Sequence, residues 1–284
     1  MERTKVRGSL RRKNRKLGLN AFISFLLLAY ILPLYYVVNN AFKDSTFISR
    51  QPFHITPESF STDNLVDAFN RMDYLNSLSN SAIVLVMTMV ILVISGSLAG
   101  FGITYAKNKT LNTVYLTYIA LISMPLQIAM IPLMVLMRDL NLGNTHLGMA
   151  LIYTAIYMPF VVFLYTGFMR SIPRDLIEAA KIDGCSPVGI YIKIYMPLLT
   201  TITGMVIILR GVSTWNDLFV PIIVVSRAHM YTLTQQLFIF SASRVGQWDL
   251  LFAGTFLSMV PLMILFLAMQ KTFIKGIMSG SIKG

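Results

Sequence analysis

The sequence predicts an all-α protein that crosses a membrane about six times, and two observations lead to this fold class. First, 55% of its 284 residues are hydrophobic and only 13% are charged, whereas about 25% of the residues in an average soluble domain are charged. Second, a spanning helix needs about 20 mostly apolar residues, and six stretches of that kind occur. They lie at about 20–40, 80–106, 112–137, 147–170, 199–225 and 248–273.

Details of these stretches refine the prediction. The first apolar run, Ala21 to Val38, follows a basic segment as a secretory signal does. It is too long for the apolar core of a signal, so it is predicted to be the first span. In the second stretch Gly96 and Gly100 are four residues apart, a spacing that lets two helix backbones approach closely. Several spans contain proline, which membrane helices tolerate: Pro33, Pro125, Pro132, Pro159, Pro221 and Pro261.

The basic residues predict the orientation of the spans. With the N-terminus inside, 17 Lys and Arg lie on the cytoplasmic side, in 1–16, 107–109, 170–193 and 271–283. Six lie outside, and Arg210 lies within a span, which accounts for all 24. Because cytoplasmic loops carry the excess of Lys and Arg, both termini are predicted to be cytoplasmic. No separate folded domain is predicted in the outer loop at about 41–79.

The composition also excludes several functions. The net charge of +12 does not indicate a nucleic-acid binder, because eight of the 24 basic residues lie in the first 16. Such a cluster is typical of a topology determinant that contacts anionic lipid. The chain has one cysteine, Cys185, and three histidines, and it has no HExxH pattern and no P-loop. We therefore expect no enzyme activity, no catalytic residue, no cofactor and no metal site.

The segment 171–198 is the one long cytoplasmic connection between predicted spans. Pro173 ends the preceding span, and a short helix is predicted from about Arg174 to Asp183. Gly184 suits the left-handed position that ends this helix. Ser186 and Pro187 are typical of the cap and first residue of a second short helix.

A face for binding a partner is predicted on the first of these helices. Leu176, Ala179, Ala180 and Asp183 are spaced to lie on one side of it. The two alanines permit close approach, and Glu178 and Asp183 supply a polar rim. The alternative for this segment is an ordinary amphipathic surface loop.

These residues carry a resemblance to a known family. Glu178-Ala179-Ala180 with Asp183-Gly184, an apolar stretch and Pro197 resembles the cytoplasmic EAA loop of permeases in binding-protein-dependent ABC importers. Cys185 departs from the usual alanine. Thr200 stands where many members have a second proline, so the entry to the fifth span is expected to be straighter. Similarity to the maltose-type carbohydrate branch extends over nearly the whole chain, including Leu98-Ala99-Gly100-Phe101, Met124-Pro125, Pro132, Trp215-Asn216-Asp217 and the glycine-rich end from Gly276 to Gly284.

The resemblance implies a permease subunit of an ATP-driven importer for a sugar or oligosaccharide in the bacterial inner membrane. It looks like the second, six-helix permease of a pair. The implied partners are a second permease, two cytoplasmic ATPase subunits and an extracytoplasmic sugar-binding protein, besides membrane lipid. The chain then divides into a basic N-terminus (1–18), a transmembrane permease domain (19–275) with the coupling helix in loop 171–198, and a glycine-rich tail (276–284).

The same resemblance assigns roles to particular residues. The implied contacts with the ATPase subunits are Glu178, Ala179, Ala180, Asp183, Gly184 and Pro197 in the loop. In the tail they are Gly276, Gly280, Lys283 and Gly284.

Arg210 is a separate candidate, because a charged residue within a span usually faces a bundle interior or a cavity. With Trp215 and Asn216, two turns further toward the outer end, it is a candidate for the translocation path. The alternative is a structural pairing of Arg210 with a neighbouring helix.

Two other functions stay open for the whole chain. One is an ABC permease for another solute, such as a polyamine or phosphate. The other is a secondary transporter or channel, although such proteins usually have internal repeats or charged residues in several spans.

Overall fold

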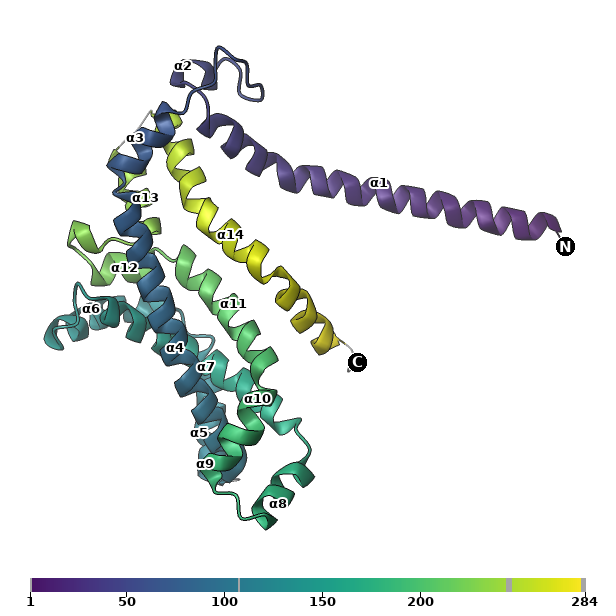
Figure 1. Cartoon of the computed structure of the whole chain (residues 1–284), viewed down its shortest axis with the longest axis vertical. Helices are drawn as coiled ribbons and strands as arrows, with labels where there is room; N and C mark the ends of the chain where they lie inside the picture. The colour runs from purple at the N-terminus through teal and green to yellow at the C-terminus, as the bar shows by residue number, and fades with distance from the viewer. Residues whose placement is uncertain (1, 107, 244–246, 282–284) are drawn as a thin grey trace. The chain divides into compact units, whose positions relative to one another are not determined.

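The computed structural model describes residues 2–106, 108–243 and 247–281, and the regular elements in these ranges are helices (Figure 1). The long ones are α1 (Glu2–Ala41), α4 (Tyr74–Ala106), α7 (His146–Arg170), α11 (Thr200–Asn216) and α14 (Trp248–Ser281). Within the described residues, three helices are long and apolar enough to cross a membrane: Gly18–Ala41, α4 and α7. Two further helical segments, Pro187–Leu198 and Thr200–Asn216, are joined at a bend, and the number of candidate spans rises to four if this pair is one span. The chain is therefore polytopic, and the count of six stays a prediction.

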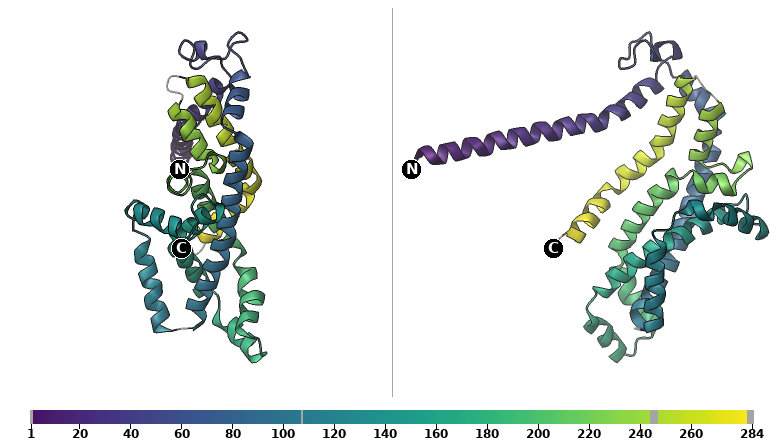
Figure 2. Two further views of the ribbon diagram at one scale, coloured as in Figure 1. Left: turned by 90° about the vertical axis from the view of Figure 1, so that its left-hand side faces the viewer. Right: turned by 180° about the vertical axis from the view of Figure 1, so that it is seen from behind.

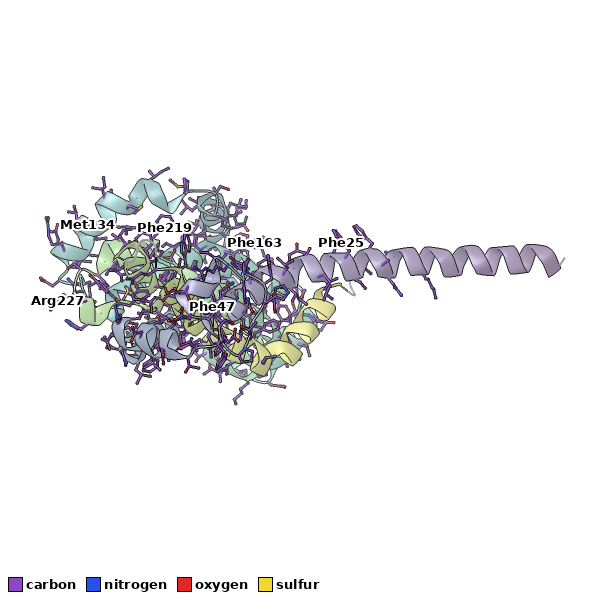
Figure 3. All side chains as sticks on the ribbon, turned by 90° about the horizontal axis from the view of Figure 1, so that it is seen from above. Phe25, Phe47, Met134, Phe163, Phe219 and Arg227 are labelled. Carbon is purple, nitrogen blue, oxygen red and sulfur yellow. The ribbon has the colours of Figure 1, made fainter. Side chains whose placement is uncertain are left out.

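The chain forms two compact units, of which the first comprises Met1–Met72 with Phe240–Met259. Here α1 packs its last turns against the start of α14, where the Tyr36 and Phe252 rings lie 5.4 Å apart and the Phe42 and Phe256 rings 5.2 Å apart. Residues 18–35 of α1 are exposed, and the Phe25 side chain, which is 66% exposed, projects from this part of the helix (Figure 3). An apolar helix of this kind needs lipid or another helix around it.

The loop 42–73 that follows α1 is ordered, which the sequence did not indicate. It holds α2 (Ser45–Ile48) and α3 (Asp63–Arg71), with a bridge between Lys43 and Phe60. Lys43 is fully buried, and its Nζ donates to the Gln51 carbonyl at 2.6 Å and to the side-chain oxygen of Asn40 at 3.3 Å. Burial lowers the pKa of the Lys43 ammonium, because the charged form loses hydration.

The second unit comprises Asp73–Ile239 with Val260–Gly284, and the α4–α7 pair is its centre (Figure 2). The predicted close approach at the two glycines is confirmed. A Cβ built on Gly96 would lie 2.6 Å from Val161 Cγ1, and one on Gly100 would lie 2.9 Å from Tyr165 Cβ. Both residues permit α7 to pack directly on the backbone of α4.

Two of the six predicted stretches are broken helices, so their description as single spans was wrong. The stretch 112–137 consists of α5 (Lys109–Leu121), η1 (Leu126–Ala129) and α6 (Met130–Asp139). Pro125 lies in the break, where it has no backbone N–H to continue a helix. The stretch 199–225 consists of α11 and α12 (Phe219–Val224). Asp217 is extended between them, and its Oδ2 accepts from the Val220 backbone N–H at 2.8 Å.

The entry to α11 is strongly bent, so the expectation of a straighter entry was wrong. The helix axis turns by 68° between Pro187–Leu198 and Thr200–Asn216. Pro197 leaves one helical hydrogen bond unmade, and the Thr200 hydroxyl donates to the Pro197 carbonyl at 2.8 Å. A hydroxyl that bonds a carbonyl of the preceding turn bends a helix. The remaining short elements are α9 (Pro187–Ile190), η2 (Tyr191–Tyr195), α10 (Met196–Leu198), η3 (Ala228–Met230) and α13 (Leu233–Ser243).

Candidate functional site

The helix predicted after Pro173 is present as α8 (Arg174–Ile182), at one end of the second unit (Figures 1 and 2). It ends as expected, because Gly184 has a φ of 78°. The backbone N–H of Gly184 donates to the Lys181 carbonyl at 3.0 Å, and that of Cys185 donates to the Ala180 carbonyl at 2.9 Å. These two bonds form the Schellman motif, which closes a helix sharply.

The second short helix is also confirmed. Ser186 caps α9, since its Oγ accepts from the Gly189 backbone N–H at 3.2 Å, and Pro187 occupies the first turn. The chain then continues through the π-helical η2 into α10, where Pro197 lies. From Pro187 to Asn216 the chain is therefore helical apart from Leu199, where it bends by 68°.

One side of α8 anchors it to the second unit. Ile177 is 9% exposed and belongs to the hydrophobic core, against which Ala180 and Cys185 also pack. Of the two alanines predicted to face a partner, only Ala179 is exposed, and Ala180 is half-buried. Ala180 is half-buried because it lies next to Ile177, on the anchored side of the helix. The contact of both alanines with an ATPase subunit stays a prediction.

The opposite side of α8 is uncovered and largely apolar. Ile182 is 86% exposed and Leu176 is 50% exposed, with Ala179 and Asp183 beside them. We call these four residues the outer face of α8. An exposed apolar patch with a charged edge is typical of a surface that binds a partner. Ile182 was missed from the sequence, although its place three residues after Ala179 puts it on the same side of the helix.

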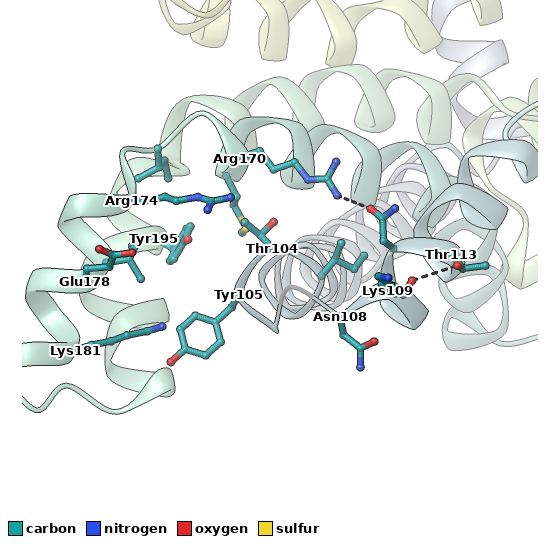
Figure 4. Close-up of a pocket in the computed structure, with 15 residues that line it drawn as sticks. Thr104, Tyr105, Asn108, Lys109, Thr113, Arg170, Arg174, Glu178, Lys181 and Tyr195 are labelled. Atoms are coloured by element: carbon teal, nitrogen blue, oxygen red, sulfur yellow. Dashed lines mark hydrogen bonds between the residues drawn. The ribbon is translucent and has the colours of Figure 1, made fainter.

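Glu178 lies away from the outer face. It lines a cavity of about 730 Å³ between α8 and the ends of the neighbouring helices, together with Arg174, Lys181 and Tyr195 (Figure 4). Glu178 and Asp183 are five residues apart, which is about 140° around a helix with 3.6 residues per turn, so they do not lie along one edge of α8. The contact of Glu178 with an ATPase subunit stays a prediction.

A cluster of aromatic rings fixes η2 to the end of α4. The Phe101 ring lies 5.2 Å from that of Tyr191 and 5.3 Å from that of Tyr195. One turn earlier, the buried Ser97 hydroxyl is 2.7 Å from the Tyr191 hydroxyl. Aromatic contacts and a buried hydrogen bond make this joint between η2 and α4 stiff.

Arg210 of α11 lies against α7. Its guanidinium carbon is 4.0 Å from the centre of the Phe160 ring and 4.9 Å from that of Tyr157. Its Nε is buried and has no hydrogen-bond partner among the described residues. A guanidinium stacked on aromatic faces is stabilised by the charge distribution of the rings. The contacts therefore match the structural alternative, a pairing with a neighbouring helix.

The three residues proposed for a translocation path do not share one surface. Trp215 lines a separate apolar groove with residues of α4, and Asn216 is exposed, with its amide bonded to the Val212 carbonyl of its own helix at 3.0 Å. Sequence reasoning missed a row of aromatic residues on α7. Tyr153, Tyr157 and Phe160, at i, i+4 and i+7, form one stripe, and this spacing is the signal that marks them.

The predicted tail is partly outside the described residues. Gly276 and Gly280 lie on the backbone of α14, which extends to Ser281. Lys283 and Gly284 lie outside the described residues.

The long apolar helices define a multi-pass membrane protein, with the short exposed helix α8 at one end of the second unit. Residues 93–279 match the family described as binding-protein-dependent transport system inner membrane component. The chain belongs to this family.

Similar proteins extend the comparison over most of the chain. The melibiose/raffinose/stachyose import permease protein MelC of Bacillus subtilis is 35% identical over 257 residues, which cover 90% of this chain and 92% of that protein. The arabinooligosaccharides transport system permease protein AraQ of Bacillus subtilis is 30% identical over 272 residues, 95% of this chain and 96% of that protein. A solved bacterial ABC transporter for the import of the acidic polysaccharide alginate has a chain with the same fold, with a TM-score of 0.75, 17% identity, and coverage of 92% of this chain and 97% of that one.

Proposed function

We propose that this chain is one of two permease subunits of an ATP-driven importer for a sugar or oligosaccharide, and that it transmits the motion of an ATPase through α8. The outer face of α8 carries this proposal. A short helix that is anchored on one side and apolar on the other has the form of a docking element. The names of the similar permeases, which refer to melibiose, raffinose, stachyose and arabinooligosaccharides, favour a sugar as the substrate.

The partners follow from the same assignment. An ATPase subunit binds the outer face of α8, a second permease covers uncovered apolar helix surface such as that of α1, and an extracytoplasmic binding protein delivers the sugar. Hydrolysis takes place on the ATPase subunits, and this chain itself is not an enzyme. Exposed Leu and Ile side chains on α8 suit a hydrophobic groove on the ATPase.

Both termini and the segment 171–198 are cytoplasmic in this proposal, on the basis of the distribution of basic residues. An impermeant maleimide applied to intact cells should label Glu58→Cys in the outer loop of a Cys185→Ser background. The native Cys185, which is half-buried, should react only after the membrane is permeabilised. Labelling of Cys185 in sealed cells would reverse the orientation.

The decisive experiment measures sugar-stimulated ATPase activity of the importer reconstituted in proteoliposomes. Ala179→Trp places a large ring on the outer face and should abolish stimulation, while the permease is still inserted at the wild-type level. Ala179→Ser keeps a small side chain at the same position and should retain stimulation. A complex that couples normally with Ala179→Trp would remove α8 as the coupling element.

The same preparation separates the other candidate functions. Uptake that continues without ATP and follows an ion gradient would contradict an ABC importer. If a polyamine or phosphate with its binding protein stimulates the ATPase and a sugar does not, the chain is still an ABC permease, but its substrate is not a sugar.

The tail from 277 to 284 is proposed to contact the ATPase pair and regulate turnover. Its deletion should change the ATPase rate of the assembled complex without changing the amount of permease in the membrane. Unchanged ATPase and transport rates would make the tail a surface extension.

A further inference from the structure

The cavity behind α8 is lined by residues that the coupling role does not use. It lies between α8, the end of α7, the junction of α4 and α5, and η2, and has a volume of about 730 Å³ (Figure 4). The outer face of α8 points away from it. An occupant of this cavity would therefore touch the helix on the side opposite the docking surface.

The charge of the cavity is strongly positive. Four basic side chains line it against the single carboxylate of Glu178: Lys109, Arg170, Arg174 and Lys181. The ion pairs within the described residues are Arg71–Asp67 and Arg138–Asp139, and neither lies in the cavity. The positive charge is therefore not balanced by the protein in this part of the chain.

Neutral groups hold two of these cations in place. The Arg170 guanidinium donates to the side-chain oxygen of Asn112 at 2.9 Å and lies 4.9 Å from the centre of the Tyr115 ring. The Lys181 ammonium lies 4.7 Å from the centre of the Tyr105 ring. These contacts position the charges without neutralising them, which prepares the site for an anion.

The ends of the spanning helices define the depth of the cavity in the membrane. The apolar helices α4 and α7 end at Ala106 and Arg170, and the cavity begins at these two ends. The end of a spanning helix lies at the level of the lipid headgroups, where Tyr and Trp are enriched. Tyr105 and Tyr195 line the cavity at this level.

From the depth, the charge and the volume we infer that this cavity binds the phosphate of an anionic lipid headgroup, with Arg174 and Lys181 of α8 as ligands. Basic pockets between spanning helices are suited to such headgroups. A bound headgroup would link α8 to α5 and α7 and stiffen its attachment to the bundle. This inference depends on the chain's membrane location and not on the solute that the permease transports.

The test uses the full-length permease in a neutral detergent and counts bound lipids by native mass spectrometry. The probes are dioleoyl phosphatidylglycerol and dioleoyl phosphatidylcholine, which share acyl chains and differ in headgroup charge. Wild-type protein should retain phosphatidylglycerol preferentially. Arg174→Gln with Lys181→Gln should weaken its binding about fivefold per charge, or about 25-fold for the pair.

Two control variants separate charge from folding. Arg138→Gln with Arg227→Gln removes two exposed cations outside the cavity and should leave the phosphatidylglycerol count unchanged. Arg174→Lys with Lys181→Arg keeps both charges and should retain the lipid. Equal retention of the two lipids by the wild type, or equal binding by the cavity variant and its control, would overturn the inference.

Competition distinguishes the two sources of a phosphate group. Millimolar inorganic phosphate and glycerol 3-phosphate should fail to displace the lipid, since neither has acyl chains in the bilayer. If either compound displaces phosphatidylglycerol from the wild type and binds the cavity variant less well, the site takes soluble phosphate and the lipid assignment is overturned.

Discussion

Replacing Gly100 with alanine tests the packing on which the whole second unit depends. The added methyl group would lie 2.9 Å from Tyr165 Cβ and 3.3 Å from the Thr166 backbone nitrogen. Ordinary contacts between carbon atoms are about 3.5–4.0 Å long. Because these obstacles are backbone or directly attached to it, no side-chain rotation relieves the clash, and α4 and α7 must separate.

Two opposing effects set the change in the free energy of unfolding caused by Gly100→Ala. Overpacking of a well-packed site costs about 1–3 kcal/mol, whereas alanine gains about 1 kcal/mol over glycine in a helix interior. Gly102 provides a matched control two residues further along α4, because a methyl group there meets nothing within 4 Å. Gly102→Ala should have only the gain in helix stability. The difference in the free energy of unfolding between the two variants therefore measures the cost of the clash at Gly100, about 1–3 kcal/mol.

The assay is reversible unfolding of the full-length permease by SDS in mixed micelles, followed by circular dichroism. We expect Gly100→Ala to have the lower free energy of unfolding of the two variants by that amount. Equal stabilities would mean that α4 and α7 do not meet at Gly100, and the packing described for this helix pair would be refuted.

Further predictions concern the outer face, the buried arginine and the break before α12. Ile182→Asp should prevent co-purification with the ATPase, whereas Ile182→Val should not, because only the aspartate places a charge on the apolar surface. Arg210→Lys keeps the charge but loses the flat stacking on Phe160, and should lower the free energy of unfolding by about 1–2 kcal/mol in the SDS titration. Tyr153→Phe removes the hydroxyl that donates to Asp217 Oδ2 at 3.0 Å and should cost about 1–3 kcal/mol in the same assay, because the bond is to a charged group.

The segment 171–198 was the most predictable part of the chain, for a physical reason. The end of α8 and the start of α9 depend on local chemistry: a glycine at positive φ, a serine cap and a proline in the first turn. These preferences act over five or six residues and can be read from the sequence alone. The close approach at Gly96 and Gly100 was predictable for a similar reason, since small residues four apart offer a flat helix surface.

The misplaced residues depended on contacts between distant parts of the chain. Spacing assigned Ala180 to the partner-binding face and Glu178 to its polar rim, but the core contact of Ile177 decides which side of α8 turns inward. Arg210 was recognised as unusual, yet its ring partners on α7 lie about 50 residues earlier in the sequence. The ordered outer loop depends on Lys43 reaching the Gln51 carbonyl, a contact that no periodic pattern indicates.

If an ATPase subunit binds α8 as proposed, the contacts of the second unit constrain how a push on α8 can spread. Between α8 and α4 lie the core contact of Ile177, the Phe101 rings and the Ser97–Tyr191 hydrogen bond. Between α4 and α7 lie the glycine contacts, which leave no free space to absorb a shift. A closely packed interface moves as a unit and does not deform gradually. A displacement of α8 should therefore move α4 and α7 together, and the main freedom left is at the 68° bend before α11. The rings of Tyr157 and Phe160 belong to α7, so such a movement would act on α11 first at their contact with Arg210.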